Sequence, residues 1–338
     1  MPMKIWMILS ASMLTLTLSG APMREVSLCE AYPAKSAPSI DGRLDEPVWK
    51  KAPVYRTYFD FSAPQRKNAA LKTELRLLFN EKGIYVGIVN FEPEIKKICH
   101  AVEPVVKDDP NLWRDDCAEL YFDPDALGIG FTQFVVNANG AVGDLRRQDR
   151  AVVFADWDGD GWTAKASIRS DRWCAEIFIP WTDLGRKASS GDLWRFSHIR
   201  FAWARGFQGI STSSGASFRN ADQLGYLYFS NGRESMTARK AAALLGGKAA
   251  VPWCIPFGRT LVVQRISGKT EFADLASLIA EAEKKRNQIS REIADEGGHV
   301  PGGQLPEGNT LDRLNALNEM NNRLFDLKWK NRLEKEFD

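Results

Sequence analysis

Several residue types and motifs on which enzymes depend are scarce in this 338-residue sequence. It contains three histidines, His100, His198 and His299, and none has a companion at the spacing of a metal site or a catalytic triad. The sequence also has no GxSxG, no HExxH and no glycine-rich phosphate loop. These absences argue against the commonest hydrolase, metalloprotease and nucleotide-dependent classes, and we predict a protein without catalytic activity of its own.

A surplus of one charge is also lacking. Lys and Arg number 45 against 43 Asp and Glu, a formal net charge of +2, and the two signs are interspersed along the chain. Binding to nucleic acid needs a basic face that neutralises phosphates, so no nucleic-acid partner is expected.

Long apolar runs are confined to the N-terminus. The run at residues 5–18 follows one lysine and precedes the small residues Ser19, Gly20 and Ala21, which predicts a signal peptide over residues 1–22. An uncleaved anchor is the alternative, although the run is shorter than the ~20 residues that span a bilayer. We therefore expect a protein that is secreted, periplasmic or on the surface of a bacterium, with no other membrane segment.

Cysteines are few and widely spaced. Cys29, Cys99, Cys117, Cys174 and Cys254 form no CxxC pair, and their odd number leaves at least one thiol free. Cys117 and Cys174 lie in alternating apolar runs, which is typical of small core residues. A disulfide such as Cys99–Cys117 is one option, but the spacing does not determine any pairing.

Short alternating apolar runs fill the chain from about residue 34 to residue 230. They predict strands at residues 71–79, 83–91, 117–123, 131–138, 162–168, 173–179, 195–204 and 224–230. Turn residues separate the runs, and no helical period lies between them. This pattern favours an all-β antiparallel β-sandwich, jelly-roll-like, over residues 34–232.

The periodicity changes after residue 232. Residues 233–268 are predicted to be a linker. Apolar residues then recur at helical spacing in residues 271–295, as at Leu275, Leu278 and Ala282, and in residues 311–333, as at Met320, Leu324 and Leu327. The sequence therefore predicts a helical hairpin or coiled-coil extension over residues 269–338. It could pack on the sandwich, associate with itself or bind a protein partner.

The segment "WRDDCAELYFDPD", residues 113–125, concentrates carboxylates. If it forms a strand, Asp115 and Glu119 share a face but lie about 13 Å apart, and Asp116 points to the other face. The paired carboxyl groups of glycosidases stand roughly 5 to 9.5 Å apart. A catalytic pair within the segment is geometrically poor, and Asp115 and Asp116 are expected to serve a turn or a structural cation.

A second acidic segment is "DWDGDGW", which places Asp156, Asp158 and Asp160 at alternate positions. This spacing resembles the start of a calcium loop, but Ser167 occupies the place of the bidentate Glu that an EF-hand requires. A structural calcium ion at Asp156, Asp158 and Asp160 is one interpretation, and a solvated Asp/Gly turn is the other. No further cofactor is expected.

A binding groove is the third interpretation of residues 113–125. Trp113 would offer a flat apolar face to a sugar ring, and the Glu119 carboxylate would accept hydrogen bonds from hydroxyl groups. Six extended residues span about 20 Å, so Trp113 must lie on a loop that folds back over the sheet. Residues 107–113, with Pro110 and Asn111, have suitable loop chemistry.

Six blocks of sequence, taken in order, resemble carbohydrate-binding module family 9. They are "PSIDGRLDEPVWKKA" (38–52), "LRLLFNEKGIYVGI" (75–88), "WRDDCAELYFDPD" (113–125), "FTQFVVNANG" (131–140), "WCAEIFIPWTDLG" (173–185) and "SFRNADQLGYLYF" (217–229).

The resemblance implies a β-sandwich that binds a mono- or oligosaccharide, or a polysaccharide chain end, between two aromatic side chains. Trp113 matches one aromatic, Phe218 stands where the second, usually Trp, is found, Glu119 matches the polar carboxylate and Arg219 follows as in the family. Val135 stands where sugar-binding members can carry an Arg. For Asp41, Gly42 and Trp49 we expect a turn and a buried indole.

The main hypothesis is therefore an exported, non-catalytic sugar-binding protein, associated with glycoside hydrolases in polysaccharide degradation or uptake. One alternative is a haem-binding redox module with His198 as the axial ligand. Another is a scaffold or interaction protein that acts through its C-terminal helices.

Overall fold

The structure is a computed structural model, which describes residues 24–62, 67–105, 107–148, 152–154, 157–213, 220–295 and 308–335. The predicted signal peptide, residues 1–22, lies outside the described residues, as do Phe218, Arg219 and Asp156.

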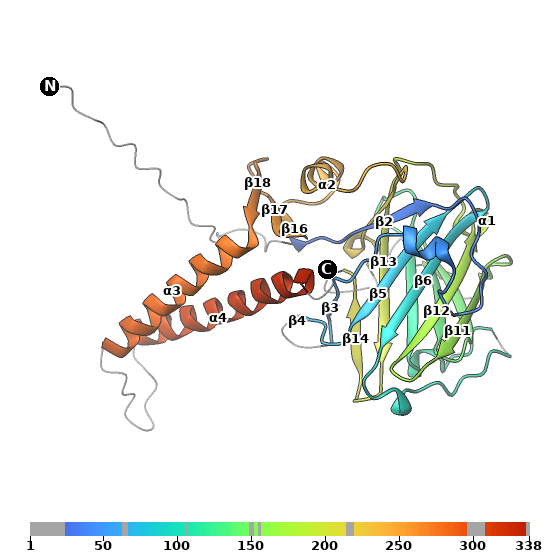
Figure 1. Ribbon diagram of the computed structural model, residues 1–338, viewed down its shortest axis with the longest axis horizontal. Helices are drawn as coiled ribbons and strands as arrows, with labels where there is room; N and C mark the ends of the chain where they lie inside the picture. Colours follow the sequence, from blue (N-terminus) through green and yellow to red (C-terminus); the bar gives the residue numbers. More distant parts are fainter. Residues whose placement is uncertain are drawn as a thin grey trace.

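One large β-sheet forms the body of the molecule (Figure 1). Its strands are β2 Leu28–Pro33, β3 Phe59–Asp60, β4 Lys67–Asn68, β5 Thr73–Phe79, β6 Gly83–Phe91, β7 Cys117–Asp123, β8 Phe131–Asn137, β9 Val142–Gln148, β10 Val152–Phe154, β11 Thr163–Ile168, β12 Arg172–Pro180, β13 Leu193–Ala202, β14 Gln208–Ser211 and β15 Gly225–Phe229. They follow the order β10-β9-β8-β7-β13-β15-β2-β5-β6-β12-β11, and β14, β3 and β4 join through β13. The mostly β fold is as predicted, and jelly-roll connectivity stays a prediction.

The eight strands predicted from sequence are all present, each within two residues of its expected ends at most. One feature of the sheet differs from the prediction of an antiparallel sandwich. Strand β2 runs parallel to both of its neighbours, β15 and β5. It comes from the N-terminal end of the chain and is joined to neither neighbour by a tight turn, so no hairpin imposes antiparallel pairing.

The inner core of the sandwich is built from alternate residues of the strands. In β7, for example, Ala118, Leu120 and Phe122 point into this core, together with Phe134 and Val136 of β8. The intervening residues Cys117 and Tyr121 belong to a different cluster on the outer side of the sheet. Because side chains alternate along a strand, the same strands carry the core on one face and the outer cluster on the other.

A short turn packs Trp49 against the sheet. The 3-10 turn Pro47–Lys51 places the indole of Trp49, 2 % exposed, against Leu78 and Tyr85. Further 3-10 turns are Ile95–Lys97, Leu112–Arg114 and Ala221–Gln223, and a short helix, α1, spans Trp181–Leu184.

A second, smaller sheet lies beside the sandwich. It contains β1 Arg24–Glu25, β16 Trp253–Phe257, β17 Thr260–Gln264 and β18 Thr270–Asp274 in the order β1-β16-β17-β18. Helix α2, Ala238–Leu245, precedes it. Leu28 and Tyr228 of the sandwich pack with Leu245, Trp253 and Ile255 in one cluster. The segment predicted to be a linker, residues 233–268, is therefore largely folded. Its strand β16 pairs with β1 from the N-terminal end of the chain, so the local sequence alone does not reveal that this segment belongs to a sheet.

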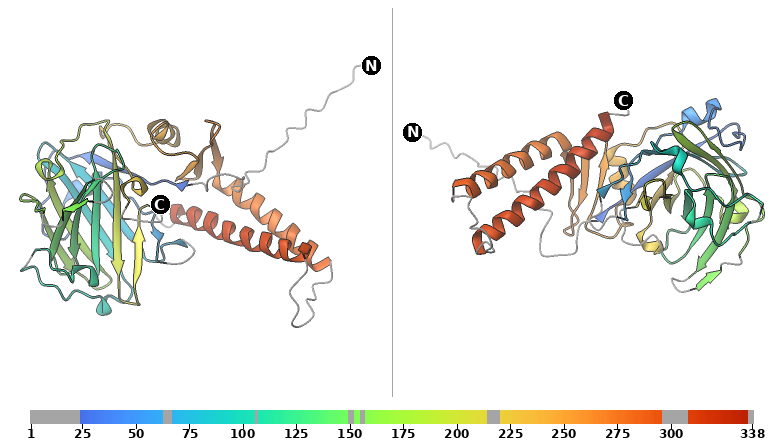
Figure 2. Two further views of the ribbon diagram at one scale, coloured as in Figure 1. Left: turned by 180° about the vertical axis from the view of Figure 1, so that it is seen from behind. Right: turned by 90° about the horizontal axis from the view of Figure 1, so that it is seen from below.

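Two C-terminal helices, α3 Leu275–Asp295 and α4 Gly308–Lys335, lie side by side and extend away from the sandwich (Figures 1 and 2). Leu275, Leu278 and Ala282 pack with Met320, Leu324 and Leu327 and with Leu261 and Val263 of β17. The predicted apolar stripes thus face one another and the small sheet. Within the described residues, no helix is sufficiently long and apolar to traverse a bilayer.

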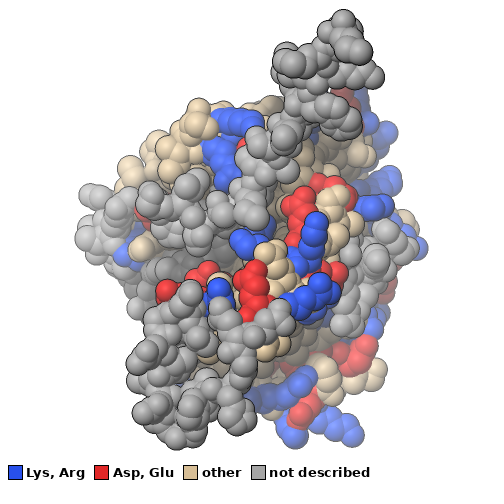
Figure 3. Space-filling model, turned by 90° about the vertical axis from the view of Figure 1, so that its left-hand side faces the viewer, with Lys and Arg blue, Asp and Glu red and all other residues tan. Residues whose placement is uncertain are grey.

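Acidic and basic side chains alternate over the end of the molecule where these helices lie (Figure 3). One example is the pair Glu283 and Lys328, whose charged atoms lie 2.5 Å apart between α3 and α4. Among the described residues on this face the two signs are interspersed, in agreement with the even composition of the chain.

Candidate functional site

An outer apolar layer covers the face of β7, β8 and β13 that points away from the core. Its members share burial and contact with one another. They are Val102, Leu112, Cys117, Tyr121, Phe131, Val135, Ala141, Ile199, Phe201, Ala221 and Leu224, with Phe61, Trp113 and Leu145 packed against them. Trp113 and Glu119, the two residues of this region predicted to bind sugar, both lie on this face of the sheet.

Trp113 is positioned by a 3-10 turn, Leu112–Arg114, directly before β7. Leu112 is fully buried and anchors the turn, whereas Trp113 is half-buried and packs against the outer apolar layer. The loop therefore folds back over the sheet, as the distance argument from the sequence requires. Part of the indole stays available for contact with a ligand.

Glu119 lies at the centre of the layer in β7, between Val135 of β8 and Ile199 of β13. Its carboxylate is fully buried, and Oε2 accepts hydrogen bonds from the Tyr121 hydroxyl and from Gln133 Nε2, the latter at 3.0 Å. In this conformation Glu119 contacts protein groups and is not open to solvent. Val135 of the neighbouring strand is also buried and apolar.

The adjacent aspartates Asp115 and Asp116 hold the loops around Trp113. Asp115 accepts hydrogen bonds from the backbone N–H groups of Ala101 and Val102 at 2.9 and 2.8 Å, and from the side chain of Asn137 at 2.8 Å. Asp116 accepts from the N–H of Cys99 at 2.8 Å. Both are buried, and they bind loop backbone, as expected of residues that serve a turn.

Burial raises the pKa of Asp116 to about 6, while the Cys99 N–H and the charge of Arg200 oppose the rise. Asp116 also accepts from the N–H of Trp203, at 3.3 Å. The start of β7 is thereby tied to the loop that follows β13.

An aromatic pair on this second loop was not expected from the sequence. The rings of Trp203 and Phe207 lie 4.8 Å apart, and Phe207 is 41 % exposed. Phe207 also contacts Phe201 of the outer apolar layer, with ring centroids 5.2 Å apart. In the sequence, the segment "FAWARGF" (201–207) resembles the end of a strand. Only the exposure of Phe207 in the folded chain shows that this aromatic pair lies at the surface.

The first and fifth blocks of the family resemblance meet at one carboxylate. Glu176 of β12 accepts hydrogen bonds from the N–H groups of Asp41 and Gly42 at 2.9 and 2.8 Å, and from Trp49 Nε1 at 2.7 Å. Gly42 adopts φ +84°, and a Cβ there would lie 2.8 Å from the backbone of Ala166. These motifs are structural, as the expected turn and buried indole imply.

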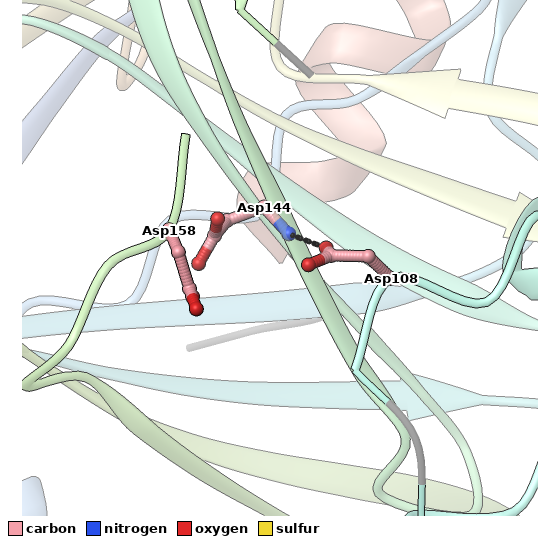
Figure 4. Close-up of side chains that lie close together, drawn as sticks. All are labelled: Asp108, Asp144 and Asp158. Carbon is pink, nitrogen blue, oxygen red and sulfur yellow. Dashed lines mark hydrogen bonds between the residues drawn. The ribbon is translucent and has the colours of Figure 1, made fainter. Parts of the chain in front are cut away.

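The predicted calcium residues lie differently from the expected loop. Asp158 stands beside Asp108 and Asp144, which come from other parts of the chain (Figure 4). Asp160 is exposed, and Asp156 lies outside the described residues. Asp108 accepts a hydrogen bond from the N–H of Asp144 at 2.7 Å, drawn as the dashed line in Figure 4.

A lysine already supplies positive charge to this cluster. Lys107 Nζ lies 2.6 Å from Asp144 Oδ2 and also pairs with Asp158. Asp144 is buried and accepts from Trp162 Nε1 at 2.6 Å. The ammonium thus compensates two of the carboxylates in a partly exposed ion-pair network.

His198, the candidate haem ligand, is fully buried in β13. Its Nδ1 lies 2.8 Å from the Tyr58 hydroxyl, and burial, with a smaller effect of Arg200, lowers its pKa to about 3. The ring has no exposed surface at which a haem iron could approach, so the geometry gives the haem alternative no support.

No protein-family model and no curated protein matches the chain. Solved structures similar to it include a carbohydrate binding module family 9 from Caldicellulosiruptor kristjanssonii. The complex with cellotriose has a TM-score of 0.46 and 16% identity, covering 62% of this chain and 96% of that one. The complex with glucose has a TM-score of 0.44 and 17% identity, covering 62% and 99%.

A candidate carbohydrate-binding protein from Bacteroides uniformis ATCC 8492 is similar at a TM-score of 0.49 and 12% identity, covering 61% of this chain and all of that one. The similar structures thus include the family that the sequence blocks resemble. The functional argument below rests on this chain's own residues.

Proposed function

We propose that the protein is an exported, non-catalytic sugar-binding module whose ligand rests on the outer apolar layer at Trp113. The observation that carries the proposal is the half-buried indole of Trp113, held by a short turn on the same face of the sheet as Glu119. An exposed aromatic face suits the CH-rich side of a sugar ring.

Two further features support this site. Asp115 and Asp116 fix the loops at this end of the sheet through backbone hydrogen bonds, which pre-organises the surface around Trp113. In addition, Glu119, Tyr121 and Gln133 form a polar group within an otherwise apolar layer. These side chains can form hydrogen bonds with the hydroxyl groups of a sugar once the ligand displaces part of the protein that covers them.

The finer parts of the proposal rest on the resemblance to family 9. Phe218 would form the second aromatic wall and Arg219 would donate hydrogen bonds to the sugar. The ligand would be a mono- or oligosaccharide or a chain end, and the setting polysaccharide degradation or uptake. Export rests on the predicted signal peptide.

Calorimetric titration with glucose and cellotriose tests the proposal. Wild-type protein should bind at least one of them, and Trp113→Ala should lower that affinity by about tenfold or more, because one aromatic wall is lost. Trp157→Ala is the matched control, since Trp157 is also half-buried but packs toward the inner core. Equal affinity in Trp113→Ala and wild type would place the ligand elsewhere.

A second proposal concerns α3 and α4, which extend away from the sandwich (Figure 2). This arrangement favours a role in contacts with a protein partner or a second copy of the chain, in addition to sugar binding. Light scattering of the full chain against a form that ends at Asp274 tests it, and an unchanged monomer in both would contradict self-association.

A further inference from the structure

A pocket of about 380 Å³ lies between the sandwich and the small C-terminal sheet. Strand β2, which lies between β15 and β5, forms part of its wall. Its first residues run beside β15, with Leu28 opposite Tyr226, but it pairs with β5 only from Ala31 onward. The strands separate ahead of that point, and the turn between β16 and β17 closes the opening from the other side. The volume is in the range of small-molecule sites, about 300 to 1,000 Å³.

The polar lining carries more negative than positive charge. Glu25 and Glu30 line the pocket, and the one cationic side chain in the lining is Arg56. Arg56 is committed to Glu74, with its Nε 3.2 Å from the carboxylate. Glu30 is one of the lining residues, and its Oε2 has no hydrogen-bond partner within the protein.

The charge of Glu30 is also uncompensated by its neighbours. Burial raises the pKa of Glu30, and the charge of Lys240 on α2 only partly opposes this. Lys240 forms its ion pair with Glu234, at 3.6 Å. A positively charged ligand that binds beside a half-buried carboxylate without a close cation stabilises the ionised carboxylate.

The apolar lining adds aromatic rings. Tyr55 and Phe257 are half-buried and stand on different elements of the pocket wall, and Ile255 and Leu77 complete it. The negative face of an aromatic ring attracts cations, most strongly where water is excluded. A carboxylate together with aromatic rings in one concave site is the arrangement that recognises an ammonium group on an apolar body.

We infer that this pocket is a second ligand site, distinct from the sugar face at Trp113, and that it binds a small organic ammonium compound. The ammonium group pairs with Glu30, and the apolar body packs on Phe257. The site requires both the sandwich and the C-terminal sheet, which gives the folded segment after residue 232 a function of its own.

Titration of the full chain with cyclohexylamine, followed by calorimetry and by chemical-shift changes, tests the inference. Cyclohexanol, which has the same ring and no charge, is the ligand control. Saturable binding of cyclohexylamine is expected, with cyclohexanol weaker by about tenfold or more, because the neutral compound forms no ion pair. Neither compound is a sugar, so the result is independent of the proposed function.

Two variants locate the site. Glu30→Gln should weaken cyclohexylamine about tenfold while leaving cyclohexanol unchanged. Phe257→Leu keeps an apolar side chain but removes the ring, and should also weaken the amine selectively. Glu319→Gln, an exposed glutamate on α4, should behave as wild type. Equal binding of both compounds, or cyclohexylamine binding unaffected in Glu30→Gln and Phe257→Leu, would overturn the inference.

Discussion

Several buried carboxylates in this protein accept hydrogen bonds from backbone N–H groups and thereby hold loops in place. Asp115 and Asp116 look like reactive groups in the sequence, yet both are buried and accept hydrogen bonds from loop N–H groups, as does the buried Glu176. An unpaired N–H in the interior costs about 1 to 3 kcal/mol, so a carboxylate that satisfies several of them determines the path of a loop. Asp144 and Asp158 likewise pair with Lys107, and a calcium ion at Asp156, Asp158 and Asp160 stays a prediction.

His198 gives a prediction at this scale. Its folded-state pKa of about 3 lies below the ordinary 6.5. The folded state therefore binds fewer protons than the unfolded chain, and the stability that neutral His198 contributes is lost as pH falls from about 6.5 toward 3. The free energy of unfolding should lose up to about 1.4 kcal/mol per pH unit from this group.

Urea unfolding of wild type and His198→Asn between pH 4 and 7 measures this effect. The amide oxygen of Asn can still accept from Tyr58, but it does not titrate, so the pH slope should be smaller in the variant. His100→Asn, at an exposed histidine, should keep the wild-type slope. Identical slopes in wild type and His198→Asn would show that His198 does not cause the dependence.

At the scale of elements, single carboxylate side chains attach loops to the sheet and to one another through several hydrogen bonds each. The loop before Trp49 is joined to β12 through Glu176, and the turn that carries Trp113 is joined to neighbouring loops through Asp115. These contacts let irregular segments lie on the sheet without unsatisfied backbone groups.

The attachment of the first loop is directly testable. In Glu176→Gln the amide NH₂ replaces one acceptor and faces the N–H donors of residues 41–44 and the Trp49 indole, so the free energy of unfolding should fall by about 3 kcal/mol. Chemical denaturation monitored by tryptophan fluorescence measures the loss. Asp45→Asn, an exposed change in the same motif, should alter stability by less than about 0.5 kcal/mol. A similar cost for both variants would refute the role given to Glu176.

At the scale of the whole molecule, the small sheet packs on both the sandwich and the C-terminal helices. Its β16 pairs with β1, just before β2 enters the sandwich, and its β17 supports α3 and α4 through Leu261 and Val263. The helices pack chiefly on this sheet and on each other. Among the described residues, the sandwich core includes none from the C-terminal elements.

Deletion of residues 275–338 should therefore leave the sandwich folded. The shortened chain is expected to keep a β-type circular dichroism spectrum and the same sugar affinity as the full chain, but to unfold at a lower temperature because Leu261 and Val263 lose their cover. Leu324→Asp in the full chain should give the same direction of change, and Leu314→Asp, at a site 37 % exposed, should have little effect. Loss of the β spectrum on deletion would contradict this division.

The sequence by itself determined the β-sandwich strands and the two C-terminal helices, because alternation and helical spacing record which face of an element is buried. It also indicated that Trp113 must fold back over the sheet and that Trp49 is buried. Both inferences depend on local geometry, and the structure agrees with them.

Only the tertiary structure decided what depends on distant pairs of residues. The parallel insertion of β2, the pairing of β1 with β16, the placement of Lys107 among three aspartates and the pocket at Glu30 each join segments far apart in the chain. No periodicity encodes such a pair, since each partner alone looks like an ordinary surface or strand residue. The burial of Glu119 follows from the same cause, because the covering of a strand is supplied by other parts of the chain.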